Sequence, residues 1–256
     1  MSDHLDPDLL EKNPDRIRDM FGDIARRYDL ANTLLTGGTD FLWRNRTAIE
    51  LVRPLRKRIR AGQLQSPPVL LDACAGSMKL GHRIRHHLNG NGHLVGTDFC
   101  IPLLKQGREW DPDEHTDRVA GDVLQLPFRT SSVDAVSIGF GYRNLEDRAR
   151  GLRELHRVLR PHGLLAILEF HMPPPSLIQH LYMLYFDNVL PAIGNLIAGT
   201  DTGAYNYLNE SVRAFPAPDV IKEEFTSNAY RILQHRPMML GTVHLYVLSA
   251  EPNMQK

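Results

Sequence analysis

Between Val69 and Phe170, short apolar runs alternate with amphipathic helical segments, and this alternation constrains the fold more than any other feature. The apolar runs are VLLDACA (69–75), HLVGTD (93–98), RVAGD (118–122), VDAVSIGFG (133–141) and LLAILEF (164–170). Helical patterns lie between them, around 79–89, 101–109 and 147–160. Alternating strands and helices predict a parallel sheet that is covered by helices on both faces.

The last part of the chain departs from this alternation. Two strand-like runs, YRILQHRPM (230–238) and TVHLYVLSA (242–250), are separated by only a few residues. Parallel neighbours need a long crossover connection, so these two runs must pair antiparallel. The sequence therefore predicts an α/β fold with a mostly parallel sheet and an antiparallel strand at the end of the chain.

Two helical patterns precede the first strand. Asn13 followed by Pro14 is a typical helix start, and apolar residues then recur at helical spacing up to Tyr28. A second pattern follows Gly37–Gly38 and contains Pro54, which we expect to kink or divide it. The segment AGQLQSPP (61–68) has the composition of a linker.

Ligands of an open parallel sheet bind beyond the carboxyl ends of the strands, so the residues that close each strand are informative. These residues are Asp72 with the following loop through Gly76, then Asp98, Asp122 and Gly139. Glycine lets a backbone approach a ligand closely, and an acid after the second strand is suited to ribose hydroxyls. The set favours a nucleoside site, although each glycine alone is equally well explained as a turn residue.

A dinucleotide site is the first competing interpretation. It requires the spacing G-x-G-x-x-G, whereas this loop offers Gly76 and Gly81 with Met78 and Lys79 between them. A pyrophosphate would therefore lack its cradle, and the nucleoside interpretation is the better one.

Composition excludes several classes of protein. The chain has 30 Lys+Arg and 30 Asp+Glu, which argues against a nucleic-acid-binding protein. Its 2 cysteines are too few for a disulfide framework or a structural zinc site. His82 and His86 have metal-ligand spacing, but neighbouring arginines would repel a cation, so we expect no metal. The acidic N-terminus lacks signal-peptide features, and we expect a cytoplasmic protein.

Several longer stretches carry a resemblance to a known family. They are VAGDVLQLPF (119–128), GFGYRNL (139–145), HRVLRPHGLLAILEF (156–170) and MFGDIARRYDLANTLLTGGTDFLWR (20–44). With LPAIGNLIAGT (190–200) and AYNYLNESVRAFP (204–216), they resemble the ubiquinone/menaquinone-biosynthesis C-methyltransferases over about residues 14–250.

The resemblance implies a class I, Rossmann-like methyltransferase fold that depends on S-adenosylmethionine (SAM). This fold has a seven-stranded, mostly parallel sheet with an antiparallel last strand. It also implies an N-terminal helical cap over 1–64 and a methyltransferase domain over 65–256, with a substrate-covering helical insertion at about 173–215. The substrate implied is a prenylated quinol, most simply demethylmenaquinol that is converted to menaquinol.

The same resemblance implies roles for individual residues. Gly76 and its neighbours Asp72 and Cys74 would face the methionine part of SAM. Asp98 with Phe99 would bind the ribose, and Asp122 with Val123 would hold the adenine. The other cofactor-pocket residues implied are Gly139 and Tyr28.

The chemistry of ring methylation adds the catalytic candidates. A ring carbon becomes nucleophilic when a quinol hydroxyl loses its proton, so the site must stabilise oxyanion charge and orient the ring. Arg143 offers a charged fork of donors for the oxyanion, and Asn144 is suited to orient the ring. Tyr28 is the third catalytic candidate. In the alternative interpretation, Arg143 forms a salt bridge with a nearby acid such as Glu146.

Three tyrosines are candidates for contact with the substrate. Tyr182 and Tyr185 lie in an apolar segment, and Tyr205 follows it. One interpretation is a lid over the prenyl tail and the quinone. Burial of a helix on the sheet explains the same pattern equally well.

The first loop departs from the family's pattern. The family typically has D-x-A-C-G-T-G-D, whereas Met78 and Lys79 here replace the later glycine and the acid. Met78 would either crowd the cofactor or fill space elsewhere, and Lys79 would favour the carboxylate of SAM over its ammonium. This degenerate loop motivates two alternatives: a non-catalytic protein that binds a quinone precursor or a partner enzyme, and a methyltransferase for another small molecule.

Charge is unevenly distributed along the chain. Residues 44–60 hold seven bases and one acid. Weak docking of this segment on anionic lipid would bring the protein to a membrane-dissolved substrate, while a solvated helix face is the simpler explanation. The sequence leaves open whether the chain is a monomer or a homodimer.

Overall fold

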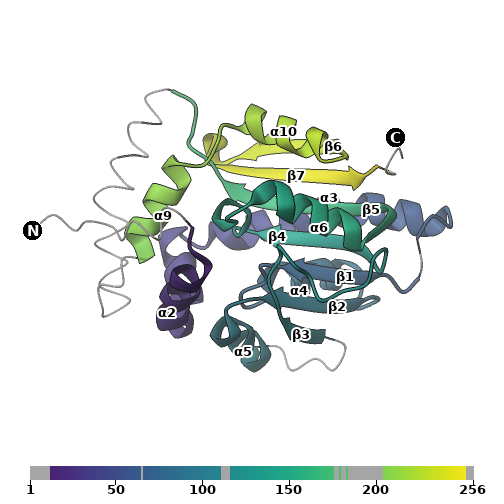
Figure 1. Ribbon diagram of the computed structural model, residues 1–256, viewed down its shortest axis with the longest axis horizontal. Helices are drawn as coiled ribbons and strands as arrows, with labels where there is room; N and C mark the ends of the chain where they lie inside the picture. Colours follow the sequence, from purple (N-terminus) through teal and green to yellow (C-terminus); the bar gives the residue numbers. More distant parts are fainter. Residues whose placement is uncertain are drawn as a thin grey trace, which may run out of the picture.

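The computed structural model describes residues 12–64, 66–110, 116–175, 179, 183 and 204–251. Their strands form a seven-stranded sheet in the order β3-β2-β1-β4-β5-β7-β6 (Figure 1). The strand bounds are β1 Val69–Ala73, β2 His93–Asp98, β3 Thr116–Ala120, β4 Val133–Gly139, β5 Leu159–Phe170, β6 Tyr230–Met238 and β7 Val243–Ala250.

The strand pairing confirms the predicted sheet. The pairs β2–β3, β1–β2, β1–β4 and β4–β5 are all parallel. Strand β7 runs antiparallel to both β5 and β6, as the short connection between the last two runs requires. The third strand is shifted from its predicted position: it ends at Ala120, so Asp122 lies in the loop beyond it.

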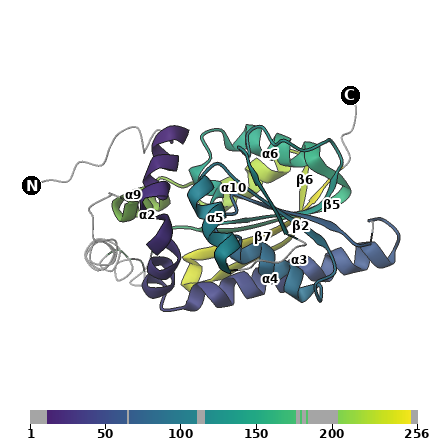
Figure 2. The same cartoon turned by 90° about the horizontal axis from the view of Figure 1, so that it is seen from below.

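Helices cover both faces of the sheet. Figure 2 shows α3 (Thr39–Arg60) and α4 (Lys79–His87) on one face, and α6 (Arg148–Val158) and α10 (Pro218–Ser227) on the other. Alternate residues of β5 point to opposite faces. Leu164 and Leu168 pack in the cluster with α3 and α4, whereas Leu165 packs with α6 and α10. This alternation places β5 at the centre of both cores.

Of the two outcomes expected at Pro54, a kink or a division, the division is wrong, because α3 is continuous across it. Apolar residues of α3 keep it on the sheet: Trp43, Leu51 and Leu55 are buried in the same cluster as the strands. The helix therefore shares the main core of the sheet.

The first helix, α2 (Pro14–Leu35), begins as predicted. The Asn13 side chain accepts hydrogen bonds from the amides of Asp15 and Arg16, which satisfies donors that the helix leaves unpaired. Ile17 and Met20 are buried with Tyr207 of α9 (Ala204–Arg213). Figure 1 shows α2 and α9 at one end of the sheet, where the parallel strands end.

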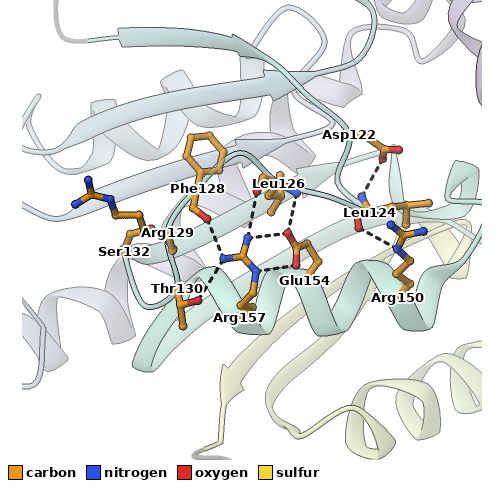
Figure 3. A network of polar contacts seen from close by, with 10 residues as sticks. All are labelled: Asp122, Leu124, Leu126, Phe128, Arg129, Thr130, Ser132, Arg150, Glu154 and Arg157. Atoms are coloured by element: carbon orange, nitrogen blue, oxygen red, sulfur yellow. Dashed lines mark hydrogen bonds and ion pairs between the residues drawn. The ribbon is translucent and has the colours of Figure 1, made fainter.

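A polar network fixes the loop that follows β3 (Figure 3). Arg157 of α6 donates to the carbonyls of Leu126 and Phe128 at 3.1 and 2.9 Å. Glu154, held by Arg157, accepts a 2.8 Å hydrogen bond from the Leu126 amide. The ion pair lowers the pKa of Glu154. Helix α6 thus holds the backbone of this loop at both its donors and its acceptors.

The turn between β1 and α4 contains the unusual Met78. Its backbone has φ of 64°, a left-handed conformation that is unfavourable for residues other than glycine. Its side chain is fully buried and packs over Gly96 of β2, where an added Cβ would overlap it. Gly96 has no side chain, so it leaves space in the core, and the side chain of Met78 fills this space.

This packing predicts that positions 78 and 96 are energetically coupled. Met78→Gly should lower the free energy of unfolding by about 2–4 kcal/mol, because a buried side chain is lost. Gly96→Ala should cost about 1–3 kcal/mol through overpacking. The double variant should lose clearly less than the sum, because the new methyl group occupies the vacated space. Urea unfolding measures all three, and additivity within about 0.5 kcal/mol would contradict the packing account.

Buried histidines gather at the end of β5. The Tyr246 hydroxyl lies 3.1 Å from His171 Nε2 and 3.4 Å from His244 Nδ1, and His235 Nε2 lies 2.8 Å from the same Nδ1. Burial, with a smaller contribution from neighbouring histidines, lowers the pKa of His171 to about 3 and that of His244 to about 4. The cluster is therefore neutral in the folded protein near pH 7.

This cluster predicts a loss of stability in acid. In the unfolded chain a histidine binds a proton near pH 6.5, so each contributes stability above that pH. This stability is lost, at about 1.4 kcal/mol per pH unit for each histidine, as the pH falls toward the folded pKa of 3 to 4. Asp72 acts in the opposite direction, since burial raises its pKa to about 6.

Comparison of variants cancels the contribution of Asp72. His244→Gln should lose less stability than the unmodified protein between pH 7 and pH 5 in urea unfolding. The exposed His162, whose φ of 66° suits asparagine, provides the control His162→Asn, which should keep the original pH dependence. An unchanged slope in His244→Gln would contradict the assignment of a neutral buried histidine.

Candidate cofactor and active site

A cavity of about 70 Å³ lies at the carboxyl ends of β1, β2 and β4, against α2. The structure brings six of the predicted site residues to its wall: Cys74, Gly76, Asp98, Phe99, Gly139 and Asn144. They come from three strand ends and the short helix η1 (Tyr142–Asn144). Of the strand-end residues predicted for a nucleoside site, Gly76, Asp98 and Gly139 thus lie together at one cavity.

Asp98 is the acid of this cavity. One carboxylate oxygen accepts from the Gly76 amide and the other from the Cys100 amide, both at 2.8 Å. Burial raises the pKa of Asp98, while these backbone donors oppose the shift. Each oxygen retains a lone pair, so the carboxylate can still accept hydrogen bonds from a ligand diol.

Asp72 has a different place from the one predicted. It does not line the cavity and is 1% exposed. One of its oxygens accepts a 2.5 Å hydrogen bond from the Ser137 hydroxyl, and the other accepts a 3.0 Å bond from the Gly81 amide. Asp72 therefore joins β1, β4 and α4 behind the cavity.

Small residues keep one wall of the cavity open. A Cβ added at Gly139 would lie 3.2 Å from Arg44 Nη1, and one at Gly141 would overlap the Cys74 side chain. A larger residue at either position would therefore displace a side chain that lines the cavity, Arg44 or Cys74. This wall has the character of a surface that a ligand approaches closely.

The residues predicted for the adenine do not reach this cavity in the structure. Asp122 accepts a 2.8 Å hydrogen bond from the Leu124 amide, and Val123 is buried against α6 residues in the core. Both lie in the loop that Arg150 and Arg157 hold (Figure 3). They lie on the loop next to the end of β3, outside the wall formed by the six residues above.

Arg143 and Asn144 have distinct surroundings. Arg143 is 3% exposed and lies behind the cavity wall, where its Nη1 pairs with Glu169 Oε1 at 2.9 Å. Its Nε donates to the Ser211 hydroxyl of α9 at 3.2 Å. The salt bridge considered for Arg143 thus exists, with Glu169 rather than Glu146 as the acid. Asn144 does line the cavity, and its Oδ1 accepts a hydrogen bond from the Tyr207 hydroxyl.

Four predicted residues cannot be assessed. Tyr182 and Tyr185 lie outside the described residues, and the side chains of Tyr28 on α2 and Tyr205 on α9 are likewise not described. Their proposed contacts with cofactor and substrate stay predictions.

Sequence patterns gave no role in the site to several residues of the cavity wall. Ile17 and Phe21 of α2 cover one side, and Arg44 of α3 contributes a cation. The two α2 residues had no signal beyond lying in or near the stretch 20–44 that carries the resemblance, and Arg44 was assigned only to the basic segment 44–60. Helical periodicity marked the α2 residues simply as apolar, so it did not separate core from cavity wall.

The described part of the chain holds no group of three or more His, Cys, Asp or Glu residues that could bind a metal. Among the described helices, none has both the length and the apolar character needed to cross a bilayer.

Comparison with known proteins agrees with these features. Residues 9–247 match the model of the ubiE/COQ5 methyltransferase family. The chain is 38% identical over 230 residues to a demethylmenaquinone methyltransferase of Thermus thermophilus, covering 89% of this chain and 98% of that protein. It is 36% identical over 242 residues to a ubiquinone/menaquinone biosynthesis C-methyltransferase of a Geobacter species, covering 93% and 97%.

Solved structures share the fold at low sequence identity. A SAM-dependent methyltransferase from Aquifex aeolicus superposes with a TM-score of 0.53 at 12% identity, covering 77% of this chain and 89% of that one. Another, from Thermotoga maritima, has a TM-score of 0.58 at 12% identity and covers 91% and 99%. The predicted class I fold is confirmed, and the family match over nearly the whole chain establishes that the protein belongs to the ubiE/COQ5 methyltransferase family.

Proposed function

We propose that this protein transfers a methyl group from SAM to a ring carbon of demethylmenaquinol and so forms menaquinol. The observation that carries this proposal is the near full-length match to a demethylmenaquinone methyltransferase, 38% identical over 98% of that relative. The match to the family model supports SAM-dependent C-methylation. In this reaction the ring carbon loses a proton and gains the methyl group. SAM is converted to S-adenosylhomocysteine.

The residues of the cavity fit SAM. Asp98 supplies an acceptor for the ribose hydroxyls, and glycines at 76, 139 and 141 leave room for close approach. When bound, SAM supplies an electrophilic methyl group on its sulfonium. We propose that the loop with Asp122 and Val123 borders the adenine, and that α6 fixes its position through Arg157.

The size of the cavity indicates how the cofactor enters. Its volume of about 70 Å³ is far below that of usual ligand pockets, which hold roughly 300–1,000 Å³. Ile17 and Phe21 form the wall on α2, and α2 rests on two small clusters, one with Tyr207 and one with Cys100 and Leu103, rather than on the main core. We propose that α2 moves away from the sheet to admit SAM.

Asn144 is the candidate that can touch a substrate. Its side chain lines the cavity and is oriented by the Tyr207 hydroxyl, so its amide can hold a quinol oxygen while the ring carbon faces the methyl group. We propose that Arg143, paired with Glu169, acts as a positioning residue, because it is buried and its Nη1 also donates to the Phe140 carbonyl.

The alternatives receive different support. Crowding by Met78 motivated a non-catalytic protein, but this side chain packs over Gly96 and does not line the cavity. The name of the Geobacter relative favours the ubiquinone precursor as a second substrate of the same reaction. A different small-molecule acceptor has no specific observation in its favour.

Lipid contact and a homodimer stay predictions. Arg44 lies apart from the bases in the second half of α3, because the helix spans 22 residues, or about 33 Å, and Arg53, Arg56, Lys57 and Arg60 line one groove further along it. Arg44 lines the cavity at the carboxyl ends of the parallel strands. Arg60 lies near Pro68, which precedes β1, and so at the amino ends of these strands. Docking through the end of α3 that carries Arg60 would therefore hold the cavity away from the bilayer.

The proposed reaction predicts a specific product. Incubation with SAM and a reduced short-chain demethylmenaquinone should increase the mass of the quinone by one CH₂ group, as measured by mass spectrometry. The oxidised quinone serves as the control and should stay unmodified, since it has no hydroxyl to ionise. SAM binding without any methylated product would instead support the non-catalytic alternative.

The role of Asn144 predicts a separation of turnover from cofactor binding. Asn144→Ala should lower kcat by about 10²-fold, because a group that orients the reacting ring is lost. Its dissociation constant for S-adenosylhomocysteine should change little. Tyr207→Phe, which removes only the orienting hydroxyl, should have a smaller effect of the same kind. Full turnover by Asn144→Ala would refute the assignment.

A further inference from the structure

We propose that Arg44 and Lys79 form a cationic clamp that binds the carboxylate at the amino-acid end of the cofactor. This inference rests on the proposed function, since it assumes that the cavity at Asp98 receives SAM. It adds Arg44 to Lys79, whose place in the first loop already favoured the carboxylate of SAM over its ammonium.

The first observation is the place of the two cations. Both line the cavity with Asp98, and both also line an adjoining groove of about 550 Å³ between the start of α3 and α4. Ser77 is the third residue that the two spaces share. The clamp therefore stands where the cofactor cavity and the groove share a wall.

The second observation is the way Arg44 is held. Its side chain is 14% exposed, its guanidinium lies 5.1 Å from the centroid of the Phe140 ring, and a Cβ at Gly139 would be 3.2 Å from Nη1. Its Nε is 3.6 Å from Asp40 Oδ2, too far for a hydrogen bond, and finds no other partner among the described residues. A buried donor of this kind is costly unless it has an acceptor.

The third observation is the local balance of charge. Lys79 is the first residue of α4, so its cation lies at the positive end of the helix dipole. Among the described residues that line the groove, Asp40 is the only acid, and it faces Arg44, while Asp98 lies on the cavity side of the junction. An anion is therefore favoured at this junction, and a ligand ammonium is not. The carboxylate of the methionine moiety fits, and the guanidinium fork can bind it with two hydrogen bonds.

Two ligands distinguish this clamp from the rest of the cofactor site. S-adenosylhomocysteine carries the carboxylate, whereas 5′-methylthioadenosine has the same adenosine and thioether without the amino-acid end. Arg44→Gln/Lys79→Gln should weaken binding of the first about 100-fold, since each charge-assisted contact is worth roughly a tenfold change. Binding of the second should change less than about threefold. Isothermal titration calorimetry measures both ligands.

Matched variants complete the test. Arg83→Gln removes the same charge one turn further along α4, in the groove but outside the cofactor cavity, and should bind both ligands normally. Lys79→Glu should weaken S-adenosylhomocysteine more than Lys79→Gln does, because it repels the carboxylate. Arg44→Lys provides a charge-conserving variant if the glutamine variant does not fold, and it should retain most of the affinity.

The outcomes separate the clamp from the function on which it rests. Equal losses for both ligands, or unchanged affinity for S-adenosylhomocysteine in the double variant, would overturn the clamp alone. If the unmodified protein bound neither ligand, the proposed SAM site would be overturned and the clamp with it. A selective loss for the ligand with the carboxylate would support both.

Discussion

The buried carboxylate of Asp72 is the interaction on which the arrangement of the site depends. Its two oxygens accept from Ser137 on β4 and from the Gly81 amide of α4, so one side chain joins three elements. Burial raises its pKa to about 6, which shows that desolvation opposes the charge that these donors favour. With these elements fixed, the loop from Cys74 to Ser77 has a defined position at the end of β1, and the cavity wall follows from it.

Much of the fold was predictable because it follows from periodicity and chain connectivity. The alternation between Val69 and Phe170 implied the parallel sheet, and the short link before β7 implied antiparallel pairing. The fate of Pro54 was not predictable, because burial of Leu51 and Leu55 holds α3 against the sheet on both sides of the proline. Tertiary packing therefore overrides a local preference here.

The site was predictable only where it depends on strand ends. Asp98 and Gly139 reach the cavity because parallel strands end at the same edge. Asp72 also lies near this end of β1, but its side chain is bound by Ser137 and Gly81 behind the cavity. The direction of a side chain depends on such neighbours, which the strand pattern does not identify. The packing of Met78 could not be predicted from the local sequence, because the space that its side chain fills lies over Gly96, eighteen positions further along the chain. Arg44 likewise reaches Gly139 only through the packing of α3.

Methylation at carbon can be distinguished from methylation at oxygen by the position of the new methyl group. The protein can be incubated with SAM labelled with ¹³C in the methyl group and with a reduced short-chain demethylmenaquinone, and the product can be examined by NMR. Methylation at carbon predicts a labelled methyl group whose long-range couplings connect it to the quinone ring carbons. No labelled methoxy group should appear. A label on a ring oxygen would contradict C-methylation, and a label confined to unreacted SAM would contradict the enzymatic function.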